Sequence, residues 1–168
     1  MVHSEDSINN KIIVKEDDKP FNFKFYDKEG KKYELNDILG KKNLIVYFYP
    51  KDFTPGCKIQ AEEFTQDYEN FIENEIEVIG ISPDSEESHT KFREKMNIPY
   101  MLASDKDNTI SKRYGAYGLK KFMGKEYYGT NRSTFLIGKN GKILKIFSKV
   151  KPAGHSKEVL SYFIEKKI

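Results

Sequence analysis

The stretch LIVYFYPKDFTPGCKIQA, residues 44–61, joins an apolar run to the start of a helix. Leu44 to Phe48 is continuously apolar and partly β-branched, which is typical of a strand buried on both faces. Thr54 is a favourable N-cap and Pro55 suits the first helical position, so we expect a helix to begin there. This register places Cys57 in the first helical turn, directly after a buried strand.

A second apolar run, from Ile76 to Ile81, predicts another buried strand. The intervening segment is long enough for a helical crossover between parallel strands, which predicts a βαβ unit. Its apolar residues recur at helical spacing and predict one amphipathic helix: Cys57, Ala61, Phe64, Tyr68, Phe71 and Ile72. The polar residues expected on its outer face are Glu62, Glu63, Gln66, Asp67 and Asn70.

Outside this unit, turn residues and periodicity predict the remaining elements. Hairpins are expected over residues 21–35, around Glu29-Gly30, and over 134–147, around Asn140-Gly141. Helices are expected at 85–96, 107–117 and from Ser156 onward, with a short strand at 100–103. The pattern predicts an α/β fold in which helices flank a mixed central sheet, with an N-terminal β-hairpin.

Length and composition indicate a single domain of ordinary surface chemistry. The chain has 168 residues, and 29 lysines and arginines nearly balance 26 acids, so no nucleic-acid partner is expected. A mean hydropathy of −0.71 and the absence of an 18-residue apolar run argue against a membrane span or membrane partner. Residues 1–16 lack a secretory signal pattern and are expected to form a mobile or loosely docked extension before a domain of residues 17–168. We expect a cytoplasmic location.

Cys57 is the only cysteine of the chain. An internal disulfide, a CxxC pair and a cysteine-rich zinc site are therefore excluded. A small buried core residue is the usual role of a lone cysteine. Backbone N–H groups and the positive end of a helix dipole favour the thiolate, however, and ligands commonly bind where a helix begins at the end of a sheet. This context favours a reactive thiol, to which the Thr54 hydroxyl can also donate a hydrogen bond.

The segment from Pro50 to Cys57 matches the pattern P-x-x-x-T-x-x-C and resembles the peroxiredoxins. Its TPGC form is similar to the bacterioferritin-comigratory-protein, or Q-type, subgroup. The resemblance extends over residues 17–168 through the segments Gly80–Ser85, Ser88–Phe92, Ser104-Asp105, Tyr114–Ala116 and Tyr128–Ile137. It implies a thioredoxin-like fold and a thiol peroxidase that reduces hydrogen peroxide and organic hydroperoxides without a metal, flavin or haem.

The same resemblance implies roles for individual residues. Cys57 would be the peroxidatic nucleophile, Thr54 a hydrogen-bond partner of sulfur and peroxide, Pro50 a shield over the pocket and Arg132 the guanidinium that completes the site. Hydrogen-bond donors fixed around both peroxide oxygens lower the barrier as charge builds on the departing oxygen. Arg132 has a plain alternative as a surface charge, and Pro50 has one as a strand terminator.

Two positions depart from the subgroup. Glu62 stands where many members carry a resolving cysteine, so the chain is similar to one-cysteine forms and needs an external thiol: thioredoxin, glutaredoxin or glutathione. Gln60 stands where glutamate is frequent, and its amide can bind Arg132 without adding charge. We expect a monomer or weak homodimer acting in antioxidant defence. The alternative is a peroxide sensor or redox-regulated chaperone, which turnover with a thiol reductant would distinguish.

Other polar clusters are interpreted as structural. His3, His89 and His155 lack the spacing of metal ligands and are expected to be surface or cap residues, so no metal is expected. Residues 104–108 resemble part of a calcium loop but lack its glycine and distal glutamate, which favours a turn and a helix cap.

Overall fold

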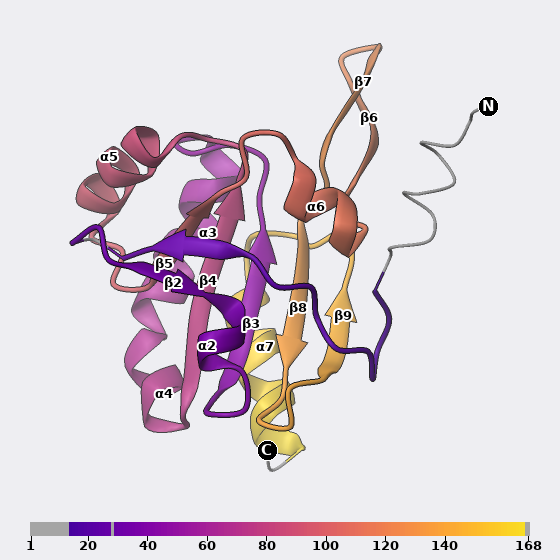
Figure 1. Ribbon diagram of the computed structural model, residues 1–168. Coiled ribbons are helices and arrows are strands. Elements are labelled where there is room, and N and C mark those ends of the chain that lie inside the picture. Colours follow the sequence, from indigo (N-terminus) through magenta and orange to yellow (C-terminus); the bar gives the residue numbers. More distant parts are fainter. Residues whose placement is uncertain (1–13, 28, 167–168) are drawn as a thin grey trace.

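A seven-stranded mixed sheet forms the centre of the computed structural model, which describes residues 14–27 and 29–166 (Figure 1). Its strand order is β2-β1-β5-β4-β3-β8-β9. The parallel pairing of β3 with β4 confirms the predicted βαβ unit, and the antiparallel pairs β1–β2 and β8–β9 confirm both predicted hairpins. The strands of this sheet are β1 (Lys24–Tyr26), β2 (Lys32–Glu34), β3 (Asn43–Phe48), β4 (Ile76–Ser82), β5 (Met101–Ser104), β8 (Ser133–Ile137) and β9 (Ile143–Phe147).

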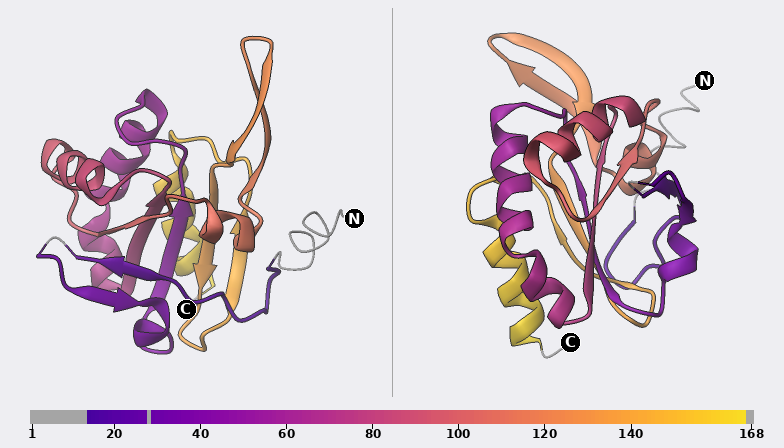
Figure 2. Two further views of the ribbon diagram at one scale, coloured as in Figure 1. Left: turned by 45° about the horizontal axis from the view of Figure 1, so that its top comes forward. Right: turned by 90° about the vertical axis from the view of Figure 1, so that its left-hand side faces the viewer.

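Helices cover both faces of the sheet. In the right-hand view of Figure 2, α3, α4 and α7 lie on one side of the strands, and α2 with the β1–β2 hairpin lies on the other. This arrangement is the expected thioredoxin-like one, with helices on both sides of a mixed sheet. The helices are α2 (Leu35–Ile38), α3 (Pro55–Gln66), α4 (Tyr68–Glu73), α5 (Glu86–Met96), α6 (Thr109–Tyr114) and α7 (His155–Glu165).

Strand β3 is apolar on both sides because it separates two hydrophobic cores. Ile45 and Tyr47 pack with α3 and α7 in one core, whereas Val46 and Phe48 belong to the other core. Successive side chains of a strand point to opposite faces, so a strand between two cores needs the continuous run seen in the sequence. Opposite Tyr47, a Cβ on Gly80 would lie only 2.9 Å from the tyrosine ring, so glycine makes room for this large side chain.

The crossover is two helices, and the prediction of a single helix is wrong. The chain leaves helical geometry at Asp67, between α3 and α4. The carboxylate of Asp67, predicted to face outward, is buried and accepts hydrogen bonds from Ser156 Oγ at 2.7 Å and Lys157 Nζ at 2.5 Å. The break also changes the helical register, which leaves Ile72 39% exposed instead of buried.

A second, two-stranded sheet lies outside the predicted elements. Strands β6 (Tyr117–Phe122) and β7 (Lys125–Thr130) pair antiparallel and project from the body of the protein beside α6 (Figures 1 and 2). Met123 and Gly124 turn between them with positive φ values of 51° and 80°, as in a type I′ hairpin. The predicted helix 107–117 is accordingly shorter, and the chain leaves α6 at Gly115, whose φ is 79°.

The start of the described chain is docked on the sheet. Val14 is buried in the core that contains Phe48, and the Asp17 N–H donates to the Ile143 carbonyl at 2.8 Å. Most of the expected extension 1–16 lies outside the described residues, but its last part does not extend freely. Among residues 14–27 and 29–166, no helix has the length and apolarity needed to cross a membrane.

Candidate active site

Cys57 is the third residue of α3, which begins at Pro55 as predicted. The preceding Thr54 occupies the N-cap position with extended backbone angles, so helical geometry begins directly after it. The thiol is 2% exposed and borders the core that contains Tyr47 and Tyr49. The first N–H groups of a helix have no partner within it, so this position surrounds the sulfur with hydrogen-bond donors.

The Thr54 hydroxyl does not make the bonds expected of it. Its hydrogen is donated to the Lys51 carbonyl at 2.8 Å, and the side chain accepts no N–H of the helix. Because a hydroxyl has one hydrogen, Thr54 cannot donate to Cys57 in this conformation. Its oxygen lone pairs remain suited to accept a hydrogen bond from a bound ligand.

Arg132 meets Cys57 across 75 positions of sequence. It lies between β7 and β8, and its Nη1 donates to Cys57 Sγ at 3.4 Å and to Gln60 Oε1 at 2.8 Å. Gln60 is 1% exposed, and its Nε2 has no partner among the described residues. The neutral amide thus orients the guanidinium without neutralising it, so the positive charge of Arg132 stays directed at the sulfur.

Gly56 is a site residue that the sequence reasoning missed. A Cβ at this position would lie 3.1 Å from Arg132 Nη2 and 3.2 Å from Pro152 Cγ. Glycine therefore lets the guanidinium lie directly against the start of α3. The available signal was a glycine inside a helix, where it is unfavourable unless close packing requires it.

Hydrogen bonds of Asp52 fix the loop between β3 and α3. Its buried carboxylate accepts hydrogen bonds from Tyr49 Oη at 2.7 Å and Ser88 Oγ at 2.8 Å, and it lies 2.8 Å from His89 Nδ1. Pro50, at the start of this loop, is partly buried where β3 ends. The loop that carries Pro50 and Thr54 is therefore attached to α5 by a buried polar cluster.

His89 was expected to be a surface or cap residue, and that prediction is wrong. It is 1% exposed, and its second ring nitrogen lies 2.9 Å from the Ala103 carbonyl oxygen. Burial alone would lower the pKa of His89, but the hydrogen bond and charge of Asp52, with smaller contributions from the Ala103 carbonyl and Glu86, raise it overall. Both ring nitrogens face acceptors, which is the environment of an imidazolium that donates two hydrogen bonds.

His155 was expected to be a surface or cap residue; it is the first residue of α7 but is buried, and it lies between Thr134 Oγ1 at 2.8 Å and Glu158 Oε1 at 2.9 Å. Burial lowers the pKa of His155. The hydrogen bond and charge of Glu158, whose side chain is 58% exposed, and the charge of Glu63 compensate only in part. His3 lies outside the described residues. Nowhere in the described part of the chain do three or more metal-binding side chains gather.

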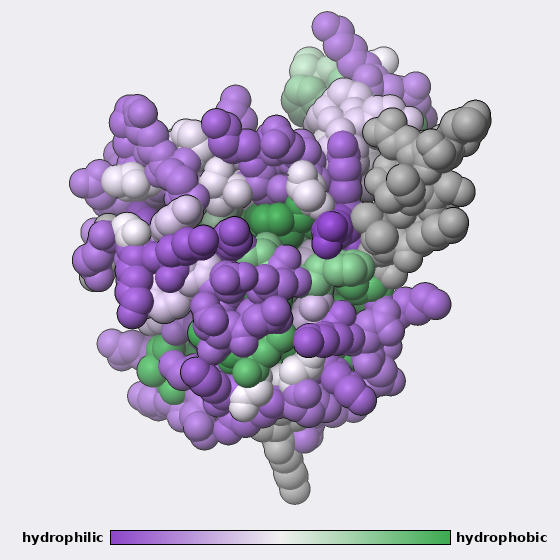
Figure 3. All heavy atoms as spheres, viewed as in Figure 1, coloured by the Kyte–Doolittle hydropathy of each residue, from purple (hydrophilic) through white to green (hydrophobic). Residues whose placement is uncertain are grey.

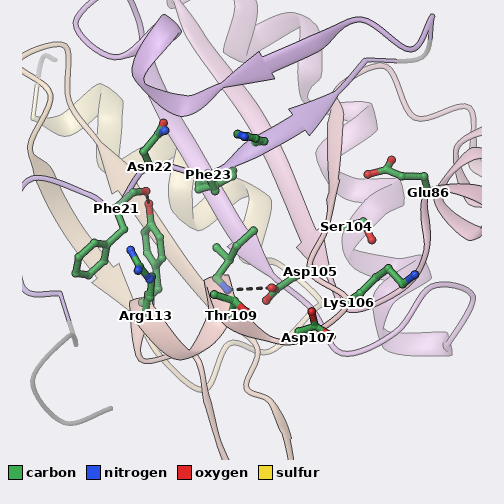
Figure 4. A pocket seen from close by; sticks show the side chains of 13 residues that line it. Phe21, Asn22, Phe23, Glu86, Ser104, Asp105, Lys106, Asp107, Thr109 and Arg113 are labelled. Atoms are coloured by element: carbon green, nitrogen blue, oxygen red, sulfur yellow. Dashed lines mark hydrogen bonds between the residues drawn. The ribbon is translucent and has the colours of Figure 1, made fainter. Parts of the chain in front are cut away.

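A pocket of about 550 Å³ lies elsewhere, between residues 21–24 and the segment 104–114 (Figure 4). Neither Cys57 nor Arg132 lines it. At its edge, the Asp105 carboxylate accepts the N–H groups of Ile110 and Ser111 at the start of α6. This confirms the turn and helix cap inferred for residues 104–108.

Comparison with known proteins gives one consistent family. The sequence model of the AhpC/TSA family matches residues 17–146. Peroxiredoxin Bcp of Bacillus subtilis (strain 168) is 45% identical over 131 residues, covering 78% of this chain and 83% of the relative. Peroxiredoxin Bcp of Escherichia coli (strain K12) is 37% identical over 143 residues, covering 85% of this chain and 91% of the relative.

Solved structures agree with the sequence relatives. A PrxQ cysteine variant from Xylella fastidiosa superposes with a TM-score of 0.85 at 30% identity, covering 92% of this chain and 98% of that one. The bacterioferritin comigratory protein of Xanthomonas campestris, described for its alkyl peroxide reduction activity, has a TM-score of 0.79 at 31% identity, covering 86% and 91% of the two chains.

Proposed function

Because this chain belongs to the AhpC/TSA family and is a peroxiredoxin of the Bcp or PrxQ type, a thiol peroxidase, we propose that its peroxidatic nucleophile is Cys57. The observation that carries the proposal is the 3.4 Å contact between Arg132 Nη1 and Cys57 Sγ at the first turn of α3. A guanidinium and a helix N-terminus that converge on one sulfur favour S⁻, the form that attacks peroxide.

In the proposed reaction, the Cys57 thiolate attacks the terminal oxygen of a hydroperoxide. An S–O bond forms as the O–O bond breaks, and the departing oxygen takes up a proton and leaves as water or an alcohol. Cys57 becomes a sulfenic acid, and the peroxide is reduced by two electrons. Negative charge builds on the departing oxygen, so donors aimed at it lower the barrier.

Arg132 supplies those donors in the proposal. One nitrogen, Nη1, serves Cys57 and Gln60, which leaves Nη2 and Nε to donate to the peroxide oxygens. The contact with Gln60 fixes the plane of the guanidinium, so no side-chain reorganisation is needed as charge moves from sulfur to oxygen. Gln60 is thus a positioning residue for Arg132.

Thr54 and Pro50 complete the proposed pocket. The Thr54 oxygen, with its hydrogen committed to Lys51, can accept the O–H of the hydroperoxide and so orient its terminal oxygen toward sulfur. Pro50 has no N–H and covers the end of β3, which limits the access of water to the thiolate. The buried Asp52 carboxylate keeps both residues in place through the loop.

The sulfenic acid is resolved by a thiol from outside, because the chain holds no second cysteine. Position 62, where a resolving cysteine would stand, is an exposed glutamate on α3. The proposed cellular role is antioxidant defence, and the proposed state in solution is a monomer or weak homodimer.

Peroxide consumption by the wild type and Cys57→Ser, with dithiothreitol as reductant, tests the proposal. We expect turnover of hydrogen peroxide and cumene hydroperoxide by the wild type alone. Intact mass after one equivalent of peroxide should show one added oxygen, located at Cys57. A wild-type protein that stays unmodified in millimolar peroxide would refute the nucleophile assignment.

A further inference from the structure

The β6–β7 hairpin concentrates exposed apolar side chains. Five of the ten large apolar side chains that are exposed in the described chain lie on it. In Figure 3 the hairpin, at the upper right, shows hydrophobic atoms bordered by hydrophilic ones. An exposed apolar cluster with a polar rim marks an interaction surface. The five are Leu119, Phe122, Met123, Tyr127 and Tyr128, with exposures of 51%, 66%, 86%, 47% and 68%.

The register of the hairpin divides these residues between two faces. Lys120 is paired with Tyr127 and Phe122 with Lys125, and alternation along the strands places these four residues on one face, here called the site face. Leu119 is paired with Tyr128 and Lys121 with Glu126, and these residues lie on the opposite face, here called the helix face.

The site face is the one that adjoins Cys57. Lys120 Nζ donates to the Thr130 carbonyl at 2.8 Å, two residues before Arg132. Burial lowers the pKa of Lys120, the charge of Arg132 lowers it further, and Cys57 acts in the opposite sense, as expected for an ammonium beside the site. On the other side, Lys112 Nζ lies 5.0 Å from the Tyr117 ring, so the helix face turns toward α6.

The two faces also differ in charge. The site face carries Lys120 and Lys125 and no carboxylate, whereas Lys121 on the helix face lies 3.6 Å from Glu126. Across the site, exposed Lys149 and Lys151 flank Val150, whose N–H donates to the Arg132 carbonyl at 3.0 Å. An occupant of the site face therefore meets apolar side chains beside lysines that form no salt bridge within the described part of the chain.

We propose that the site face, with Phe122 and Tyr127 as its apolar anchors, docks the protein that supplies the resolving thiol. The partner is a small dithiol carrier whose reactive cysteine lies in an apolar surface with an acidic rim. This inference rests on the proposed function, because it needs a sulfenic acid at Cys57. Like charge disfavours a second copy of the hairpin as the occupant.

The dimensions of the hairpin fit a carrier protein. A six-residue strand spans roughly 20 Å, so a partner that contacts Cys57 and also lies along the strand as far as Phe122 is larger than a small thiol. A carrier of about 100 residues has a diameter near 30 Å and covers both. Redox encounters bury small interfaces, below about 1,200 Å² in total, so two aromatic anchors and a few lysines suffice.

Reduction of the Cys57 sulfenic acid in the docked complex uses both thiols of the carrier. Its first thiolate attacks Cys57 sulfur, an S–S bond forms, the S–O bond breaks, and the oxygen leaves as water after protonation. The second carrier thiolate then attacks the carrier sulfur of this mixed disulfide and releases Cys57 as a thiolate. The carrier ends as a disulfide, and Cys57 is reduced by two electrons.

Two matched double variants test the inference: Phe122→Ser with Tyr127→Ser on the site face, and Leu119→Ser with Tyr128→Ser on the helix face. For the wild type and each variant, kcat/KM is measured with thioredoxin, glutaredoxin, glutathione or dithiothreitol as the reductant. The site-face variant should lose about tenfold or more for the protein reductant that supports turnover, the scale of truncating an interface anchor. The loss should appear in KM, with dithiothreitol-supported turnover within twofold of the wild type.

The helix-face variant should keep its kcat/KM for every reductant. Equal losses on both faces, or a loss with dithiothreitol as well, would overturn the docking assignment. So would turnover with glutathione but with neither carrier protein, or a change in sedimentation coefficient that shows the site face binding a second copy. Failure of the wild type to consume peroxide even with dithiothreitol would instead refute the proposed function.

Discussion

Two regions approach Cys57 from different sides and are built on opposite principles. In one region, here called the buried region, the β3–α3 loop is attached to α5 through Asp52 and His89, both at most 3% exposed. In the other region, the β6–β7 hairpin projects from the body (Figure 1), and five of its large apolar side chains are exposed to solvent. The first region has nearly all its polar groups partnered within the protein, and the second is held mainly by its own ladder.

This difference in burial suits the first region to positioning the reacting groups and the second to binding a partner. A thiolate and its donors must keep fixed positions, and the buried cluster around Asp52 provides this by satisfying every oxygen of the carboxylate. A docking surface gains from apolar groups that are still exposed before the partner arrives. Each of the following predictions therefore compares a change at the site or in the buried region with a matched change in the hairpin.

The largest expected effect is on stability. Phe92 in α5 is fully buried and contacts Phe53 with ring centroids 5.1 Å apart, whereas Phe122 on the hairpin is 66% exposed. Phe92→Ala should lower the free energy of unfolding by about 3–5 kcal/mol, and Phe122→Ala by at most about 0.5 kcal/mol. Urea denaturation followed by circular dichroism measures both. Similar losses would show that the hairpin is as firmly packed as the buried region.

The next effect is on the rate of peroxide reduction. Arg132→Met removes the donors beside Cys57 and should slow the attack by about 10²–10³. Lys121→Met on the hairpin removes a positive charge far from sulfur and should leave the rate unchanged. Stopped-flow competition for peroxide measures both rates. A wild-type rate in Arg132→Met would contradict the role proposed for this residue.

The smallest effect is on the pH dependence of stability. The pKa of His89 is raised in the folded protein, so its contribution is fully present below the unfolded value of about 6.5 and is lost as pH rises through the folded pKa. The stability difference between wild type and His89→Gln should therefore shrink on the alkaline side of neutrality. The groups that face His89 are the Asp52 carboxylate, the Ala103 carbonyl and Glu86.

Glu126→Gln provides the control, because the Lys121–Glu126 pair is exposed and should contribute about 0.5 kcal/mol or less. His155 acts in the opposite sense: its lowered folded pKa makes it cost stability as pH falls below the unfolded value. A difference between wild type and His89→Gln that stays constant from pH 6 to 9 would show that His89 does not titrate with folding.

Local sequence signals identified the strands β3 and β4 and the start of α3, but not the hairpin. Leu44–Phe48 and Ile76–Ile81 are apolar because both sheet faces are covered, and Thr54-Pro55 start α3 through their own backbone preferences. The hairpin has no such pattern, since Leu119, Phe122, Tyr127 and Tyr128 lie on both of its faces and none is buried. Alternation of apolar and polar residues indicates a strand only where one face of that strand is buried and the other is exposed.

The sequence by itself determined the central sheet, the crossover, the helix that starts before Cys57 and the motif that places a lone thiol in its first turn. These follow from interactions over a few residues: turn chemistry, capping and the burial pattern of a strand. The tertiary structure decided that Arg132 lies against Gly56, that Asp52 is paired with His89, that Asp67 interrupts the crossover helix, and which hairpin face adjoins the sulfur. Each of these depends on groups between 37 and 89 residues apart or on the path of the whole chain, and no local preference encodes such a contact.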